Sequence, residues 1–479
     1  MAELARLGGA AGALGLAAVL YGPSRRVRAG GLAAWAAGCG LLAIWLAPSG
    51  HHRAYAAAAA AGTVLAAGIA WLLRRVPWLL PVAILACAPA RIPVSVGHTS
   101  ANLLLPMYVV VAGAALALAR ELLGGDERTR ELGRAALPLA LFVGWTGVAF
   151  LWSQDRHQGA VELLFYVLPF GLLAVSLSRL PWRAGWMTAL YVQLAAMGLL
   201  FAVIGIWQYE RRDIFWNPKV IVDNAYATSS WFYRVNSVFY DPSIYGRFLV
   251  VAILAALVLV LFAGPAAAWS ALVVAAVTFV GLVPSFSQSS FVALGAGIVV
   301  ALAVLWRRRS LVPLALALGA LAAVSLGVPQ ARHRILGKAG ISTATGGRSN
   351  LVTGGIELAL HHPLLGVGTG AFQHAYGRQE HLPGFRPKKA ASHDTPVTVA
   401  AETGLPGLAL LLWLLAAVLA APFRGNPLLG PTGRARLVLG LALVAIVVHS
   451  LFYDALLEDP LFWGALALSA VAARRQAVA

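Results

Sequence analysis

The segment 347–408 gathers polar and ionisable side chains in a chain that is otherwise apolar almost throughout. These side chains are Arg348, Glu357, His361, His362, His374, Arg378, Glu380, His381, Lys388, Lys389, His393, Asp394 and Glu402. Charge that is scarce elsewhere and concentrated between two hydrophobic runs is typical of a functional segment. We therefore expect the chemistry of the protein here, and we expect the rest of the chain to hold this segment in place.

His393 is the candidate catalytic residue of this segment. It precedes the next apolar run by about twelve residues, so we expect it near a membrane surface. A histidine of ordinary pKa can accept the proton of a sugar hydroxyl at neutral pH. Asp394 and Glu402 either orient the imidazole or stabilise the helix expected after Thr395. A lone loop histidine is more often a simple hydrogen-bonding residue, and that interpretation stays open.

The segment Trp231–Phe248 supplies candidate anion-binding residues. Arg234 and Arg247 flank an Asp-Pro turn where the chain enters an apolar run. The fork of a guanidinium matches the oxygens of a phosphate or diphosphate. Tyr233 and Tyr240 could stack on sugar faces. Anchoring to lipid headgroups is the commoner use of such arginines and tyrosines at a membrane surface.

Two other site types fit the sequence poorly. The run G-V-G-T-G after Pro363 permits tight turns but lacks the Lys-Ser/Thr of a P-loop and the dinucleotide-binding pattern. A zinc site of His374, His381 and His393 would match no standard spacing. We therefore predict no metal and no cofactor.

The composition predicts an all-α polytopic membrane protein. Of the 479 residues, 60% are hydrophobic and only 11% are charged, whereas soluble domains carry roughly a quarter charged residues. Continuous apolar runs predict about 13 to 15 membrane-spanning helices. The net charge of +18 lies in short basic clusters between the runs, which favours contact with anionic membrane lipids over nucleic-acid binding.

The apolar runs divide the chain into five regions. We expect amino-terminal spans over 1–208, a first outer loop over 209–244 and central spans over 245–327. A large outer loop over 328–404 then carries the catalytic histidine, and carboxy-terminal spans occupy 405–479. Placing Arg307–Arg309 in the cytoplasm puts the other basic loops there and both long loops outside. The runs Trp78–Ala90 and Leu311–Gly327 are among the expected spans.

The order of motifs resembles the bacterial O-antigen ligase and O-antigen polymerase superfamily. The resemblance rests on four elements, in chain order: R-x-x-S-x-F-x-D-P-x-x-Y-G at Arg234–Gly246, S-x-S-S at Ser287–Ser290, G-R-S-N…H-P-L-L-G-V-G-T-G-x-F at Gly347–Phe372, and S-H-D…A-E-T-G-L-P-G-L at Ser392–Leu408. It covers roughly Phe201 to Phe462. The amino-terminal spans resemble those of the superfamily only in being apolar, and they carry none of its motifs.

This resemblance implies a GT-C-like, metal-independent, inverting glycosyltransferase of the inner (cytoplasmic) membrane, with its site on the periplasmic face. The donor would be a glycan on undecaprenyl diphosphate. By the same resemblance, His393 activates the acceptor hydroxyl and Arg234 holds the donor diphosphate. A further family arginine is missing at or near Ser290, and Arg247 or Arg348 would compensate for it.

The acceptor distinguishes the members of the superfamily. A ligase transfers the glycan to the lipid A core, a polymerase to a second lipid-linked glycan, and a third type to protein hydroxyls. The basic patch Arg386–Lys389 favours an anionic acceptor, so we favour the ligase. A transporter of the same lipid-linked glycan is the alternative from another class. Glu162 is nearly the only charge inside a predicted span, which counts against transport.

Overall fold

The computed structural model describes residues 2–47, 52–96, 99–215, 217–225, 232–306, 348–380, 392–424, 428 and 430–476. Almost all of this part of the chain is helical, with one short β-hairpin, which confirms the predicted all-α polytopic class. The α-helices and strands, in chain order, are α1 Ala2–Tyr21, α2 Arg25–Leu46, α3 His52–Arg75, α4 Leu79–Cys87, β1 Ile92–Val96, β2 Thr99–Leu103, α5 Leu105–Leu123, α6 Ala136–Ala149, α7 Arg156–Glu162, α8 Leu168–Ser178, α9 Ala184–Arg211, α10 Pro218–Ala225, α11 Pro242–Phe262, α12 Pro265–Leu282, α13 Gln288–Trp306, α17 Arg348–His361, α18 Phe372–Gln379, α19 Thr395–Ala420, α20 Gly430–Ser450 and α21 Pro460–Gln476. Short 3-10 turns at Gly133–Ala135, Phe150–Trp152 and Val283–Ser285 extend α6 and α12, and a π-helical stretch at Leu163–Val167 joins α7 to α8.

Twelve helices within the described residues are long and apolar enough to cross a membrane, and Pro460–Arg474 is a shorter apolar helix. The prediction of a full span over Trp78–Ala90 was wrong. Only the nine-residue helix α4 forms there, because Pro77 and Pro89 bound the run and leave too few residues to cross. The expected span Leu311–Gly327 and the cluster Arg307–Arg309 lie outside the described residues.

The β1–β2 hairpin was not predicted. Its strands pair antiparallel, with Ile92 opposite Leu103 and Val96 opposite Thr99. Residues 101–103 therefore belong to β2, whereas the apolar run Ala101–Ala119 predicted a span that begins at Ala101.

Helices α1 and α2 pack closely because small residues line their contact. A Cβ added at Gly15 would lie 2.5 Å from the carbonyl oxygen of Gly31, and one at Gly38 would lie 2.4 Å from that of Gly8. Such close backbone approach is the usual way in which membrane helices associate.

Helices α17 and α18 cover the first turns of α19. Pro363 predicts the end of a helix, and α17 does end just before it, at His361. The loop that follows turns at Gly366, Gly368 and Gly370, which all have positive φ. The loop then runs beside α19, where the amide of Val367 donates to the carbonyl of Ala401 at 2.9 Å.

Helix α19 begins ten residues earlier than the span that the sequence suggested. It starts at Thr395 and bends at Gly404, which has φ 70° and ψ −178°. His393 thus lies just before the N-cap residue of this helix, Asp394. The helix expected after Thr395 is confirmed, and it extends beyond the apolar run toward His393.

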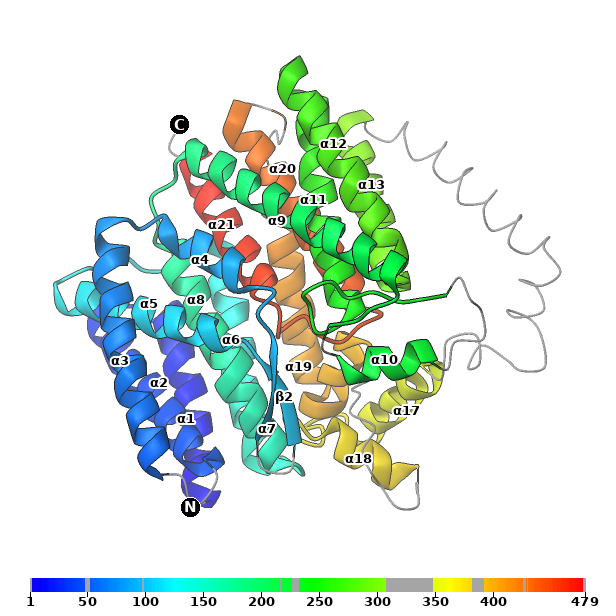
Figure 1. The fold of residues 1–479 in the computed structure, drawn as a ribbon. Helices are drawn as coiled ribbons and strands as arrows, with labels where there is room; N and C mark the ends of the chain where they lie inside the picture. Colours follow the sequence, from blue (N-terminus) through cyan, green and yellow to red (C-terminus); the bar gives the residue numbers. More distant parts are fainter. Residues whose placement is uncertain are drawn as a thin grey trace.

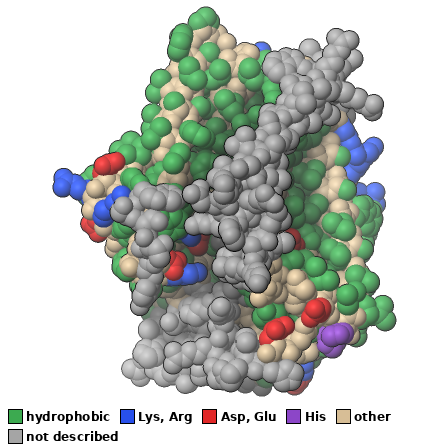
Figure 2. Space-filling view, turned by 90° about the vertical axis from the view of Figure 1, so that its right-hand side faces the viewer, with side chains coloured by type: hydrophobic (Ala, Val, Ile, Leu, Met, Phe, Trp, Pro, Cys, Tyr) green, Lys and Arg blue, Asp and Glu red, His purple; other side chains and the backbone are tan. Residues whose placement is uncertain are grey.

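The two ends of the bundle carry different polar groups. Helix α6 runs antiparallel to α19: the indole of Trp145 donates to the carbonyl of Thr403 at 2.8 Å, whereas the turn that begins α6 lies near Ala417 and Ala421. Figure 1 shows α17 and α18 at the lower end of the molecule and the C-terminus at the upper end. Figure 2 shows mostly apolar side chains on the upper described part of one face, with acidic and histidine side chains at its lower end.

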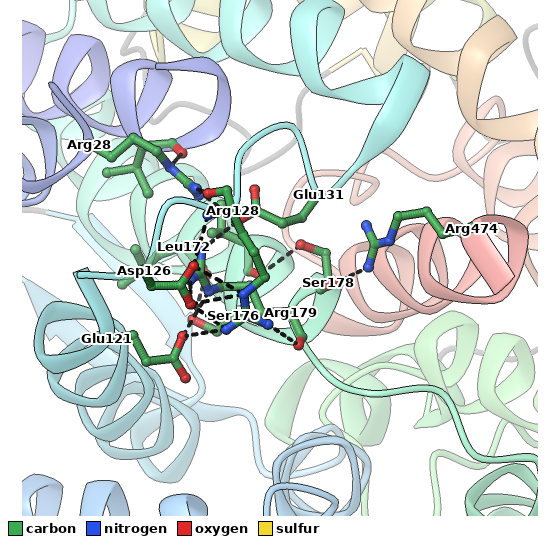
Figure 3. Close-up of polar contacts among 12 residues, drawn as sticks. Arg28, Glu121, Asp126, Arg128, Glu131, Leu172, Ser176, Ser178, Arg179 and Arg474 are labelled. Atoms are coloured by element: carbon green, nitrogen blue, oxygen red, sulfur yellow. Dashed lines mark hydrogen bonds and ion pairs between the residues drawn. The ribbon is translucent and has the colours of Figure 1, made fainter. Parts of the chain in front are cut away.

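An ion-pair network ties helices together at the end opposite α17 and α18. Glu131 accepts from Arg28 at 2.8 Å and also from Arg179. Arg179 in turn reaches Glu121 at 2.9 Å and Asp126 at 2.6 Å. Figure 3 shows these groups converging from α2, from α5 and the connection that follows it, and from the end of α8.

Candidate active site

His393 lies in a tight turn that the neighbouring side chains fix. Its φ is 63°, a conformation uncommon for residues other than glycine. The hydroxyl of Ser392 accepts from the amide of Asp394 at 3.1 Å and donates to its carbonyl at 2.6 Å. The Asp394 carboxylate accepts from the amide of Val397 at 2.9 Å and caps α19. These local hydrogen bonds therefore fix the backbone from which the imidazole of His393 extends.

The turn between α20 and α21 lies against the start of α19. The Asp454 carboxylate in this turn accepts from the hydroxyls of Thr395 and Thr398, each at 2.6 Å. Burial raises the pKa of Asp454 to about 6, and the two hydroxyl donors oppose that rise. Asp454 thus links the carboxy-terminal helices to the residues that follow His393.

Tyr453 connects His393 to a second histidine. Its ring centroid lies 6.5 Å from that of His393 and 5.6 Å from that of His449. Burial raises the pKa of Tyr453 well above its ordinary value, and the negative charge of Asp241 adds to the rise. Tyr453 is therefore a neutral hydroxyl at physiological pH, beside the candidate base.

A chain of polar contacts continues from His449 to Arg234. His449 Nε2 lies 3.0 Å from the hydroxyl of Ser289 and 3.1 Å from the carbonyl oxygen of Ser243. The hydroxyl of Ser287 lies 3.1 Å from that of Ser289, and the amide of Ser287 donates to the hydroxyl of Ser285 at 3.2 Å. Arg234 Nε donates to the carbonyl of Ser285 at 3.1 Å. The S-x-S-S segment therefore lies between Arg234 and His449, and Tyr453 lies between His449 and His393.

Arg247 is buried with part of its guanidinium unpaired. It is 1% exposed, and its Nε lies 2.9 Å from a carboxylate oxygen of Asp459. Neither Nη1 nor Nη2 has a hydrogen-bond partner among the described residues. A buried charged donor without a partner is costly, so these two nitrogens are suited to an incoming anion.

A second buried arginine shares the small cavity beside Arg247. Arg91 donates to the carboxylate of Glu458 at 3.0 Å and to its carbonyl at 2.7 Å. The cavity holds about 10 Å³, which is room for about one water molecule. A phosphate would fit there only if the turn around Asp459 opened.

The other predicted site residues lie apart from His393 or outside the described part. Glu402 is buried and accepts from the amide of Phe372 at 3.1 Å, which ties α19 to α18. The Tyr233 ring lies 5.0 Å from the guanidinium carbon of Arg212. The Tyr240 carbonyl accepts from the side chain of Asn217. The backbone of Arg348 begins α17, but its side chain lies outside the described residues.

Sequence reasoning missed the acidic turn between the last two spans. Tyr453, Asp454, Glu458 and Asp459 all come from this turn, and Arg91 contacts it from before β1. The signal was present as Y-D-A-L-L-E-D between two apolar runs. It is short, and only the tertiary structure brings it beside His393.

No cluster of three or more metal-binding side chains occurs in the part of the chain that the structure describes. The weighed zinc site cannot be traced as a whole, because His381 lies outside that part.

The fold and these groups define a multi-pass helical membrane protein with a polar, partly buried site at one end of its bundle. The family model described as O-antigen ligase matches residues 273–412. This match supports membership of the O-antigen ligase and O-antigen polymerase superfamily, and that family implies a glycosyltransferase-like enzyme. A search of curated proteins gives no match. The matched region includes Ser287–Ser290 and His393, while Arg234, Arg247 and the acidic turn lie outside it.

Proposed function

We propose that this protein transfers a glycan from undecaprenyl diphosphate to an acceptor hydroxyl with inversion, as an O-antigen ligase acting on the lipid A core. The observation that carries the proposal is the arrangement around Tyr453. The His393 ring lies 6.5 Å from this ring, and buried Arg91 and Arg247 are near enough for their positive charges to act on the Tyr453 hydroxyl. That pairing suits a reaction in which a hydroxyl loses a proton while a diphosphate departs.

In the proposed reaction, His393 accepts the proton of the acceptor hydroxyl as the oxygen attacks C1 of the first donor sugar. The new C1–O bond forms on the face opposite the diphosphate, so the configuration inverts. The C1–O bond to the phosphate breaks, and its electron pair leaves with undecaprenyl diphosphate.

Guanidinium groups stabilise the charge that develops on the leaving diphosphate, so the proposed reaction is metal-independent. Arg234 lies beside the serine segment that lacks the family arginine, and it binds one phosphate in this scheme. Arg247 is the better supported substitute for the missing arginine, because its Nη1 and Nη2 are buried without partners in the described part of the chain. Donor binding then opens the turn around Asp459 and satisfies those nitrogens.

The proposed orientation puts His393 at the periplasmic face of the bacterial inner membrane. It rests on the basic loops, since Arg74, Arg75, Arg424 and Arg474 all lie near the opposite end of the bundle.

The test is an in vitro transfer assay with purified protein and undecaprenyl-diphosphate oligosaccharide. Lipid A core and excess lipid-linked donor are offered as competing acceptors. We expect product on the lipid A core, and at least a hundredfold loss of the transfer rate in His393→Ala, since a general base contributes roughly 10²–10⁴-fold. Arg247→Gln should weaken donor binding, whereas His374→Ala on α18 serves as a matched histidine control.

Three outcomes would count against parts of the proposal. A ladder of lengthened lipid-linked glycan would identify a polymerase. Full activity of well-folded His393→Ala would remove the proposed base. Retained donor binding with neither product would favour the transporter.

A further inference from the structure

A cavity of about 430 Å³ lies at the end of the bundle opposite His393. It opens between the turn that starts α6 and the ends of α19, α20 and α21. The charged residues that line it are all arginines: Arg134, Arg424, Arg436 and Arg474. Among the described lining residues there is no carboxylate. The cavity therefore has an uncompensated positive charge.

Two of these arginines donate hydrogen bonds to backbone carbonyls and still have a guanidinium N–H without a partner among the described residues. Arg436 is 1% exposed, and its Nη2 donates to the carbonyls of Ala421, at 2.9 Å, and Arg424. Arg474 Nη2 donates to the carbonyl of Ser178, as Figure 3 shows. Arg436 Nε and Arg474 Nη1 are buried and have no partner among the described residues.

The nearby acidic network does not neutralise this cavity. Glu131 precedes the lining residue Leu132, and its charge reaches Arg474. It already accepts from both Arg28 and Arg179, so this one carboxylate cannot also balance the four arginines. Arg134 and Arg424 are exposed at the rim and form no ion pair with any described residue. The positive charge of the four guanidiniums is therefore not balanced by carboxylates of the described part of the chain, and an external anion could balance it.

The remaining walls of the cavity are apolar. They are formed by Leu132, Ala135, Ala417, Val418, Ala421, Leu466, Ala470 and Ala473. On α19, Leu412 and Trp413 are about half exposed, at 52% and 46%, as expected for a surface that faces lipid. A phosphate group attached to acyl chains matches both the arginines and these walls. A free anion would match only the arginines.

We propose that this cavity binds the phosphate headgroup of an anionic phospholipid from the leaflet at that end, preferentially one with two phosphates. Basic pockets between membrane helices are suited to such headgroups, and guanidinium forks match phosphate oxygens. The lipid would connect the start of α6 to the ends of α19, α20 and α21. This binding is independent of the proposed transfer reaction and requires no glycan.

The test uses the purified full-length protein in phosphatidylcholine nanodiscs, with cardiolipin, phosphatidylglycerol or inorganic phosphate added. Retained lipid is measured by native mass spectrometry, and the melting temperature by tryptophan fluorescence. We expect cardiolipin to bind most tightly and to raise the melting temperature. The double variant Arg134→Gln/Arg424→Gln removes only rim charges, so it should fold. Its affinity for cardiolipin should fall by about thirtyfold, from about 1 kcal/mol for each arginine.

The matched control is Arg26→Gln/Arg75→Gln, which removes the same charge from exposed residues that do not line this cavity. It should bind cardiolipin as the wild type does. Equal losses in the two double variants would mean general surface electrostatics and would overturn the proposal. Equal stabilisation by millimolar inorganic phosphate would show a soluble-anion site and overturn the lipid assignment.

Discussion

At His393 the backbone adopts a conformation that costs a histidine roughly 1–3 kcal/mol. The hydroxyl of Ser392 and the cap at Asp394 hold the turn in place. Strain of this kind persists only where the surroundings determine the geometry, and it occurs often at sites where a side chain must point in one direction. The positive φ of His393 therefore supports a functional role for this histidine, and the residue type alone did not provide that support.

The buried carboxyl of Asp454 predicts a pH dependence of stability. Its pKa of about 6 lies above the ordinary value of 3.8, so the fold favours the protonated form. A carboxyl whose pKa is raised by folding costs nothing below its unfolded pKa. It destabilises the fold progressively as the pH rises from about 4 to about 6. At pH 7 this cost is on the order of 3 kcal/mol.

Asp454→Asn should therefore be more stable than the wild type at pH 7 and close to it at pH 4. The measurement is the midpoint of unfolding in a detergent titration at several pH values. Asp155→Asn is the control, because Asp155 caps α7 through the amide of Gln158 and this substitution keeps an acceptor there. A stability difference between Asp454→Asn and the wild type that does not change between pH 4 and pH 7 would contradict the assigned pKa.

At the scale of elements, the bend in α19 positions both the histidine turn and the loop over it. Gly404 has φ 70°, and a Cβ there would lie 2.5 Å from the carbonyl oxygen of Leu364. Pro406 two residues later supports the change of direction. The first turns of α19 therefore reach His393 at an angle that a straight helix would not give.

Gly404→Ala should destabilise the protein by about 2 kcal/mol or more, because it combines a disfavoured φ with a backbone clash. The unfolding midpoint of the purified variant measures this loss, and the rate of glycan transfer should fall with it. Gly295→Ala in α13 is the matched control, since a Cβ there meets nothing within 4 Å. Equal stability of the two variants would mean that the bend is not required.

The sequence alone predicts most of the helices, but it does not predict which side chains of different helices contact one another. The apolar runs Leu4–Tyr21, Trp186–Gln208 and Tyr245–Ala263 predicted α1, α9 and α11 closely, because the length and hydropathy of a span are local properties. The membrane span was expected only from Leu405, because Thr395–Glu402 carries polar side chains whose hydrogen bonds to α18 and Asp454 are not visible in the sequence. Arg91 and Asp454 were missed for a related reason: their partners lie hundreds of residues or a whole helix away.

At the scale of the molecule, the end opposite His393 is held by buried ion pairs that connect segments distant in sequence. Arg28 is on α2, Glu131 precedes α6, and Arg179 follows α8. The side chains of Arg28, Glu131 and Arg179 are 1%, 7% and 4% exposed. This arrangement keeps one end of the bundle fixed, so that opening of the turn around Asp459 at the other end would not separate the helices.

Glu131→Gln tests that account, because it leaves two buried guanidiniums without their shared carboxylate (Figure 3). Breaking a buried pair in this way costs about 3–5 kcal/mol, so the unfolding midpoint in detergent should fall markedly. Glu127→Gln is the matched control: Glu127 pairs with Arg25 at 3.0 Å, but the two side chains are 65% and 40% exposed. Its loss should stay below about 1 kcal/mol. Similar midpoints for the two variants would mean that the network does not hold this end together, and the rigidity of the bundle would then have to come from the close packing of α1 on α2.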